Sequence, residues 1–193
     1  MFRTTQIPAF RLCMSTGILA AGLAADAHIF ALRWASSARV AKIRRVVARW
    51  QTIVGPSAAA RQYGLDVYRV TGYTAAHTGG VVFGGVTAPN LTLDTVDSVS
   101  VLDDARISDT AALVDGTFVA DADPLDVVHG AECQGAPATQ KTSQTIDMSF
   151  SEEEGGALVL RADQGIVIRN RVVTIADFTA AVVVKVKWEE IPV

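Results

Sequence analysis

Apolar and polar positions alternate along much of this chain, and this alternation predicts β-strands rather than helices. The clearest run is "TAAVVVKVKWEEI" at 179–191, in which Val182, Val184, Val186 and Trp188 occupy every second position. Successive side chains of a strand point to opposite faces of its sheet. The run therefore predicts a strand with one face in an apolar core and the other in water.

Shorter runs with the same period of two recur through the chain. The segment 28–34 places His28, Phe30, Leu32 and Trp34 on one side. Further strands are predicted from the following ranges: 63–73, 98–108, 117–123, and two strands within 156–173 around the turn Asp163-Gln164-Gly165. Two segments are predicted to be irregular, the glycine-rich 77–90 as a bent edge or loop and the polar 130–145 as a loop or insertion.

The segment 39–54, "RVAKIRRVVARWQTIV", supports two interpretations. Val40, Ile43, Val47 and Trp50 follow the spacing of three and four residues that is typical of an amphipathic helix. Its β-branched residues and the Gly-Pro that follows suit a strand equally well. The neighbouring strands favour the strand.

Many short strands separated by turn signals predict an all-β fold. The turn signals recur every 8 to 20 residues or so, which is typical of a β-sandwich or a jelly roll. Strands do not alternate with helical segments along the chain, so the sequence does not predict a parallel sheet. We therefore expect a single jelly-roll-like β-sandwich domain over 28–193, preceded by an extended N-terminal arm over 1–27.

The arm contains "STGILAAGLAADAHIF" at 15–30, which follows Arg3 and Arg11 and has the parts of a secretory signal peptide. Its apolar stretch is interrupted by Ser, Thr and Gly and is too short to cross a membrane. We interpret it as an ordered arm that packs against a neighbouring subunit, not as an export signal. Ile18, Leu19 and Leu23 are its predicted anchors.

Composition limits the function classes. Half of the 193 residues are apolar and 19% are charged, so the chain can form a real core and is not disordered. A net charge of −3 implies no strong field toward nucleic acid or membrane. We expect neither a membrane nor a specific nucleic acid as a partner.

Residues with obvious chemistry are few. The three histidines, His28, His77 and His129, include no pair at metal-ligand spacing, and no nucleophile or phosphate-binding motif occurs. Cys13 and Cys133 form one bridge or stay as two buried thiols, and we favour the thiols. The sequence predicts no catalytic, metal-binding or cofactor-binding residue, and no enzyme.

A basic run is the strongest charge pattern in the chain. Its members are Arg39, Lys42, Arg44, Arg45 and Arg49. On an acidic chain with one tryptophan beside it, such a run is typical of a solvated face or a subunit contact. We predict that it meets acidic groups of a partner protein.

Two terminal segments resemble a known family. "RLCMSTGILAAGLAADAHIFALRWASSARVAKIRRV" at 11–46 and "ALVLRADQGIVIRNRVV" with "FTAAVVVKVKWEE" within 157–190 resemble the start and end of small structural proteins encoded in tailed-bacteriophage morphogenesis regions. "DARISDTAAL" at 104–113 is similar more loosely. The resemblance carries no functional residue, because the matching motifs align structure rather than chemistry.

The resemblance implies a β-rich virion protein. We expect a capsid decoration or cement protein that binds the major capsid protein or another virion protein, as a dimer or trimer, in particles assembled in the host cytoplasm. The alternative is a receptor- or carbohydrate-binding β-sandwich of a head fibre or tail. Exposed aromatic side chains would favour that alternative, because sugars stack on them.

Overall fold

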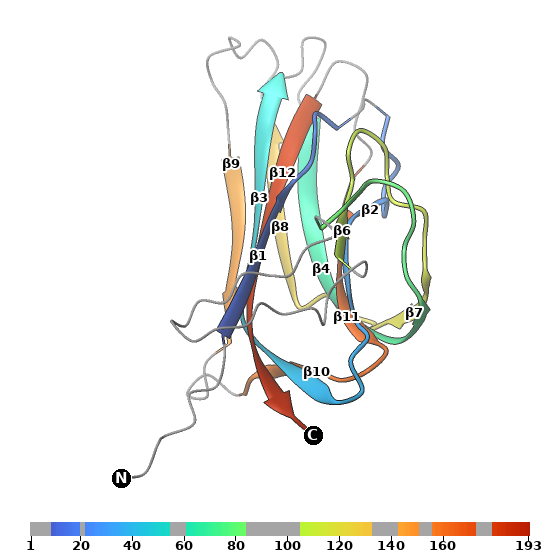
Figure 1. Cartoon of the computed structure of the whole chain (residues 1–193). Helices are drawn as coiled ribbons and strands as arrows, with labels where there is room; N and C mark the ends of the chain where they lie inside the picture. The colour runs from blue at the N-terminus through green and yellow to red at the C-terminus, as the bar shows by residue number, and fades with distance from the viewer. Residues whose placement is uncertain are drawn as a thin grey trace.

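The chain folds into two antiparallel β-sheets that pack face to face (Figure 1). The computed structural model describes residues 9–19, 22–54, 61–83, 105–132, 143–150, 156–172 and 179–193, without the side chains of residues 61, 131 and 132. Among these residues, no helix is long and apolar enough to cross a bilayer.

The first sheet, sheet A, has the strand order β1-β12-β3, and β9 and β10 share the far edge of β3. Its strands are β1 (Ala9–Ser15), β3 (Arg39–Val54), β9 (Ser143–Ser149), β10 (Leu158–Leu160) and β12 (Thr179–Pro192). The long central pair of β3 and β12 confirms the strand interpretation of 39–54.

The second sheet, sheet B, has the order β5-β6-β2-β11-β4, and β7 and β8 share the far edge of β4. Its strands are β2 (His28–Trp34), β4 (Arg61–Ala75), β5 (Val81–Val82), β6 (Ala105–Ile107), β7 (Thr117–Ala120), β8 (Asp126–Glu132) and β11 (Gln164–Asn170).

The pairing order is that of a rolled hairpin. The first strand pairs with the last (β1 with β12), the second with the next to last (β2 with β11), β3 with β9 and β10, and β4 with β8. Pairing of β12 with β3 and of β11 with β4 then joins these nested pairs into two sheets. This is the jelly-roll topology, and it confirms the predicted all-β sandwich.

The main core lies between the two sheets. Val182, Val184, Val186 and Trp188 are at most 1% exposed, so the predicted inward face of 179–191 is correct. All three tryptophans, at 34, 50 and 188, lie in this core. None of the aromatic side chains that the structure describes is exposed.

The predicted boundary at residue 28 is wrong, because the sandwich begins with β1. Phe10, Leu12 and Met14 alternate with polar residues and point into the core, and the strand pairs with β12 of the same chain. Backbone hydrogen bonds to β12 continue to Leu19, which donates to the Ala180 carbonyl at 2.8 Å. The residues before 9 lie outside the described part.

A long insertion separates β4 from β8, and it carries β5, β6 and β7. These strands belong to sheet B itself, and another part of the insertion covers the outer face of the sheet. A second apolar cluster forms there, in which Leu113 and Phe118 of the insertion pack on Ala31, Val70 and Val167 of the sheet. Sheet B is therefore covered on both faces in this region.

The sequence located some segments only in part. Two strands flank a turn within 156–173 as predicted, but the turn lies at 162–163, and Gln164 and Gly165 already belong to β11. Of the predicted strand 98–108, residues 105–107 form β6, and residues 98–104 lie outside the described part. Strands β8 and β9 were not predicted, and they border the predicted polar loop, whose residues 133–142 lie outside the described part.

Candidate metal centre and cationic face

A β-bulge places the first residue of β2 on the outer face of sheet B. Phe30 pairs with Ile168 and His28 pairs with Arg169, so Ile29 is an extra residue in the ladder. A bulge changes the face to which the following side chains point. His28 therefore leaves the inward row of Phe30, Leu32 and Trp34, with which the sequence had grouped it, and contacts the ring of Phe118 in the insertion.

A single β-bridge positions the other two members of the cluster. Thr78 and Val114 exchange two backbone hydrogen bonds, of 3.1 and 3.0 Å. In an antiparallel pair, the residues on either side of such a bridge also lie opposite each other. His77 and Asp115 are these neighbours, and their side chains share a face.

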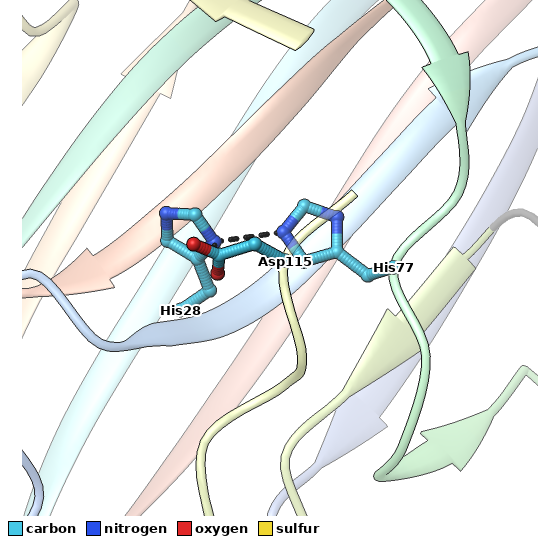
Figure 2. A group of neighbouring side chains, drawn as sticks. All are labelled: His28, His77 and Asp115. Atoms are coloured by element: carbon cyan, nitrogen blue, oxygen red, sulfur yellow. Dashed lines mark hydrogen bonds and ion pairs between the residues drawn. The ribbon is translucent and has the colours of Figure 1, made fainter. Parts of the chain in front are cut away.

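A third backbone hydrogen bond attaches the bridge to sheet B. In it, the N–H of Leu113 donates to the carbonyl of His28 at 2.9 Å. Three segments distant in sequence thus meet at one point. Figure 2 shows the side chains of His28, His77 and Asp115 turned toward one another.

The contacts within the cluster are short. His28 Nδ1 lies 2.7 Å from Asp115 Oδ1 and 2.8 Å from His77 Nε2. One ligand atom from each residue lies within 4.8 Å of the other two. Both imidazoles are buried, whereas the Asp115 side chain is 71% exposed, so the cluster opens to solvent on the side of the carboxylate.

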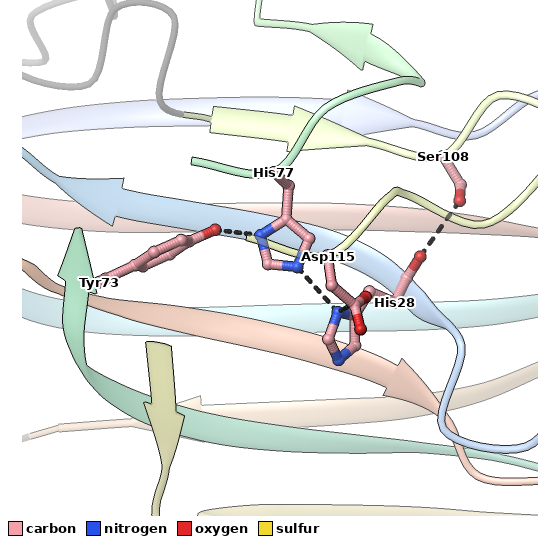
Figure 3. Close-up of polar contacts among 5 residues, drawn as sticks. All are labelled: His28, Tyr73, His77, Ser108 and Asp115. Carbon is pink, nitrogen blue, oxygen red and sulfur yellow. Dashed lines mark hydrogen bonds and ion pairs between the residues drawn. The ribbon is translucent and has the colours of Figure 1, made fainter. Parts of the chain in front are cut away.

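Neighbouring groups hold the cluster in place (Figure 3). The Tyr73 hydroxyl is hydrogen-bonded to His77 Nδ1, the ring nitrogen that faces away from His28. The Ser108 hydroxyl donates to the Ala111 carbonyl at 2.7 Å and lies 3.4 Å from the His28 carbonyl. Both imidazoles also pack against the ring of Phe118.

Burial keeps both histidines neutral at pH 7. Desolvation, assisted by the adjacent His28, lowers the pKa of His77 to about 4. Desolvation also lowers the pKa of His28, against the opposing effect of the Asp115 carboxylate. Neutral imidazoles have a free lone pair, so each ring can accept a proton or bind a metal ion.

The sequence did not predict this cluster, because the three residues are 38 to 87 positions apart and fit no spacing motif. The apparent strand period also assigned His28 to the inward face, and a bulge is not visible in that pattern. The third histidine, His129, is exposed on β8 and is not part of the cluster.

The predicted basic run lies on β3, but its charges are largely neutralised within the chain. Three of its arginines form ion pairs with acids of the same sheet: Arg39 with Glu190, Arg44 with Glu189 and Arg45 with Asp147. Arg49 donates to the Ser143 hydroxyl at 3.3 Å, and Lys42 is half-buried. The run is therefore not a row of five unpaired cations.

The structure instead brings cations from three strands into one row. Arg11 of β1 lies directly opposite Lys187 of β12, and Lys187 lies directly opposite Arg45 of β3. Like charges that are directly opposite across a sheet destabilise it. No carboxylate among the described residues pairs with Arg11, Lys185 or Lys187, and all three are exposed.

We call the outward side chains of Arg11, Arg45, Arg49, Lys185 and Lys187 the cationic face. A groove of about 640 Å³ lies along it, and its walls include Cys13 and Phe83. Cys13 is exposed and unbridged, which corrects the prediction of a buried thiol, because it alternates with the buried Leu12 and Met14. Cys133 lies outside the described residues.

The predicted anchors of the N-terminal segment separate into two groups. Leu19 and Leu23 are 1% and 7% exposed and pack in the core of their own chain, so they are not available to a neighbouring subunit. Ile18 is 55% exposed and stays a predicted contact.

No protein-family model matches the chain, and no curated protein matches it. Solved structures with some likeness are virus particles. The Israeli acute paralysis virus full particle and pentamer have TM-scores of 0.24 and identities of 11% and 12%, over 96% of this chain and 69% of theirs. The infectious bursal disease virus VP2 subviral particle has a TM-score of 0.18 and 9% identity, over 96% of this chain and 42% of that one. At these TM-scores the jelly-roll assignment depends on the strand pairing of the chain itself.

Proposed function

We propose that this chain is a structural protein of a virus particle, attached to another virion protein through its cationic face. The observation that supports this most directly is the pair of Arg11 and Lys187, which lie directly opposite each other on the outer face of sheet A and pair with no carboxylate among the described residues. Such a pair is unfavourable for the isolated chain, and an acidic partner surface would relieve the repulsion. Arg45 lies on the other side of Lys187 and is already paired with Asp147.

The jelly-roll topology is consistent with this role, since it recurs in viral capsid domains. A fold is not a function by itself, so the proposal depends on the cationic face and on the terminal segments that resemble phage structural proteins. More specifically, we propose that the chain decorates or cements the capsid lattice as a dimer or trimer. In this oligomer, Ile18 would contribute an apolar contact.

Burial of the aromatic residues argues against the alternative, a carbohydrate-binding fibre or tail domain. Trp34, Trp50 and Trp188 are at most 1% exposed, so none of them offers a stacking surface for a sugar ring. The same applies to Tyr63 and Tyr73, which are both buried.

The proposal is tested with purified particles of the virus that encodes this chain. Quantitative mass spectrometry should find the chain in the particles at a fixed ratio to the major capsid protein. Particles that lack the gene should lose their integrity at a lower temperature than complete ones. Absence of the chain from gradient-purified particles would exclude a virion role, and presence at a few copies per particle would exclude a cementing role.

A further inference from the structure

We propose that His28, His77 and Asp115 bind one divalent transition-metal ion, with Zn²⁺ as the preferred ion. The ligands are His28 Nδ1, His77 Nε2 and a carboxylate oxygen of Asp115. The proposal is independent of the virion role, because the cluster lies under the β4–β8 insertion on sheet B and the cationic face lies on sheet A.

The donor set selects the kind of ion. Two imidazole nitrogens and one carboxylate suit Zn²⁺ and its first-row neighbours, whereas Ca²⁺ and Mg²⁺ prefer sites built of oxygen atoms. Three protein ligands leave a fourth position of a tetrahedral zinc ion to water. The exposed side of the Asp115 carboxylate provides an opening for that water.

The arrangement of protons supports the same conclusion. His28 Nδ1 has one position for a hydrogen, yet it faces both His77 Nε2 and Asp115 Oδ1. If His77 Nε2 donates to His28 Nδ1, two lone pairs are left facing each other at 2.7 Å between His28 and Asp115. If His28 Nδ1 donates instead, one hydrogen serves two acceptors. A metal ion satisfies all three donor atoms together.

Zinc binding requires the donor atoms of the three residues to move slightly apart. Zinc bonds of about 2.0–2.1 Å in a tetrahedron place neighbouring donor atoms about 3.3 Å apart. The separations from His28 Nδ1 are 2.7 and 2.8 Å, so each has to grow by about half an ångström. The exposed Asp115 side chain has freedom to move, and a small rotation of one imidazole provides the rest.

A hydrogen bond outside the three ligands is compatible with the tautomer that metal binding needs. A metal on His77 Nε2 requires the ring proton on Nδ1, and the Tyr73 hydroxyl is in position to accept it. Ligating histidines commonly donate their other ring N–H to such an acceptor, which orients the ring. The Tyr73 ring is itself held between β4 and the insertion, against Phe118.

The surrounding charges do not prevent binding of a cation. Arg169 and Arg106 act on the histidines as positive charges, and Asp115 and Asp26 act as negative ones. The Arg169 guanidinium lies 4.5 Å from the centre of the Tyr68 ring, and Arg106 donates to the Gly79 carbonyl at 3.1 Å. Two positive and two negative charges thus act on the cluster, and of these only Asp115 would bind the ion directly.

The ion would act as a cross-link. His28 belongs to β2, whereas His77 and Asp115 belong to the segments that the Thr78–Val114 bridge joins. One metal ion therefore ties the insertion to sheet B. Because the unfolded chain lacks this arrangement, binding of the ion stabilises the folded state.

The test uses the full chain after removal of metals with EDTA and titration with ZnCl₂. We expect one zinc ion per chain by calorimetry and a rise in Tm as zinc is added. His77→Ala and Asp115→Ala should each weaken zinc binding at least tenfold and abolish the Tm rise. Asp115 is exposed, so its variant is expected to fold even if the buried His77 variant does not. His129→Ala, which removes an exposed histidine outside the cluster, should leave zinc binding unchanged.

Tyr73→Phe distinguishes a metal site from a hydrogen-bonded cluster. Loss of an acceptor that orients a ligand typically lowers metal affinity by about 10- to 100-fold, and we expect that range here. The proposal is overturned if the metal-depleted chain binds no zinc, or if the Asp115→Ala variant binds zinc as tightly as the unaltered chain does.

Discussion

His77 Nε2 lies 2.8 Å from His28 Nδ1, although the two residues are 49 positions apart in the sequence. The contact depends on two local irregularities, the bulge at Ile29 and the isolated bridge between Thr78 and Val114. Both are features of backbone pairing, and together they fix the insertion on the outer face of sheet B.

The first prediction concerns the pH dependence of stability of the metal-depleted chain. The folded-state pKa of His77 is about 4, against 6.5 for an unperturbed histidine, and that of His28 is also lowered. Between these values the unfolded chain binds more protons than the folded chain. Stability is therefore complete above about pH 7 and should fall as the pH drops from 6.5 toward 4.

Urea unfolding at several pH values between 7 and 4.5 measures this loss. His77→Gln removes one of the titrating groups and should lose less stability over this range than the unaltered chain. His129→Gln is the control, since that histidine is exposed. Equal losses in His77→Gln and the unaltered chain would show that His77 is protonated as readily in the folded chain as in the unfolded one.

The second prediction concerns Gly165, the second residue of β11. A Cβ atom at this position would lie 2.2 Å from the Leu32 carbonyl oxygen and 2.8 Å from the ring of Tyr73. Gly165→Ala should therefore destabilise the fold by about 1–3 kcal/mol or more and displace the Tyr73 ring. Because Tyr73 holds His77, the same variant should also bind zinc more weakly.

Gly72→Ala provides the comparison for that measurement. Gly72 has a φ of 58°, and a Cβ atom added to it would meet no other atom. Its substitution should therefore lower the stability only by the strain of a left-handed backbone, about 1–2 kcal/mol. Gly165→Ala should be the more destabilising of the two and the only one that weakens zinc binding. An equal effect of both would contradict the predicted clash.

The third prediction concerns Trp188 in the main core. Its ring stacks on Phe10 with centroids 5.8 Å apart, and its Nε1–H donates to Glu190 at 3.1 Å. Trp188→Ala should cost about 3–5 kcal/mol in the free energy of unfolding. Lys187→Ala, one residue away on the exposed face, should not lower it, because the change removes a like-charge contact with Arg11. Denaturant midpoints that are equal for both variants would show that the face assignment is inverted.

Much of the fold could be predicted because alternation identifies which side of a strand is buried. In the run at 179–191, alternation identified the buried face correctly. For 39–54, the adjacent strands favoured a strand over a helix, and the segment is a strand. The same rule applies to Phe10, Leu12 and Met14, and the strand there was missed because the segment was interpreted as an arm.

The site could not be predicted in the same way. His28 changes face at a bulge, and His77 and Asp115 meet through a bridge of one residue pair. Neither feature has a periodic signature. Likewise, the row of Arg11, Lys187 and Arg45 depends on the register between the first and last strands, which the order of residues alone does not reveal.

The fourth prediction concerns that row in the isolated chain. Lys187 faces Arg11 on one side, and on the other side it faces Arg45, which is already paired with Asp147. Lys187→Glu therefore replaces the repulsive pair with Arg11 by an attractive one. The change should stabilise the chain by about 0.2–1 kcal/mol, and less at high salt. Arg161→Glu, a charge reversal at an exposed turn residue, should show no such gain. Loss of stability in Lys187→Glu would mean that the row is not repulsive.

Binding of this protein to particles that lack it is the most direct test of the proposed function. The recombinant chain is mixed with particles from a gene-deleted virus, and the bound fraction is measured by co-sedimentation at low and high salt. We predict saturable binding that weakens as salt is raised, is lost in the Lys185→Glu/Lys187→Glu variant and is retained by Arg161→Glu. Binding of the double variant with unaltered affinity, or no binding of the unaltered chain at low salt, would contradict attachment through the cationic face.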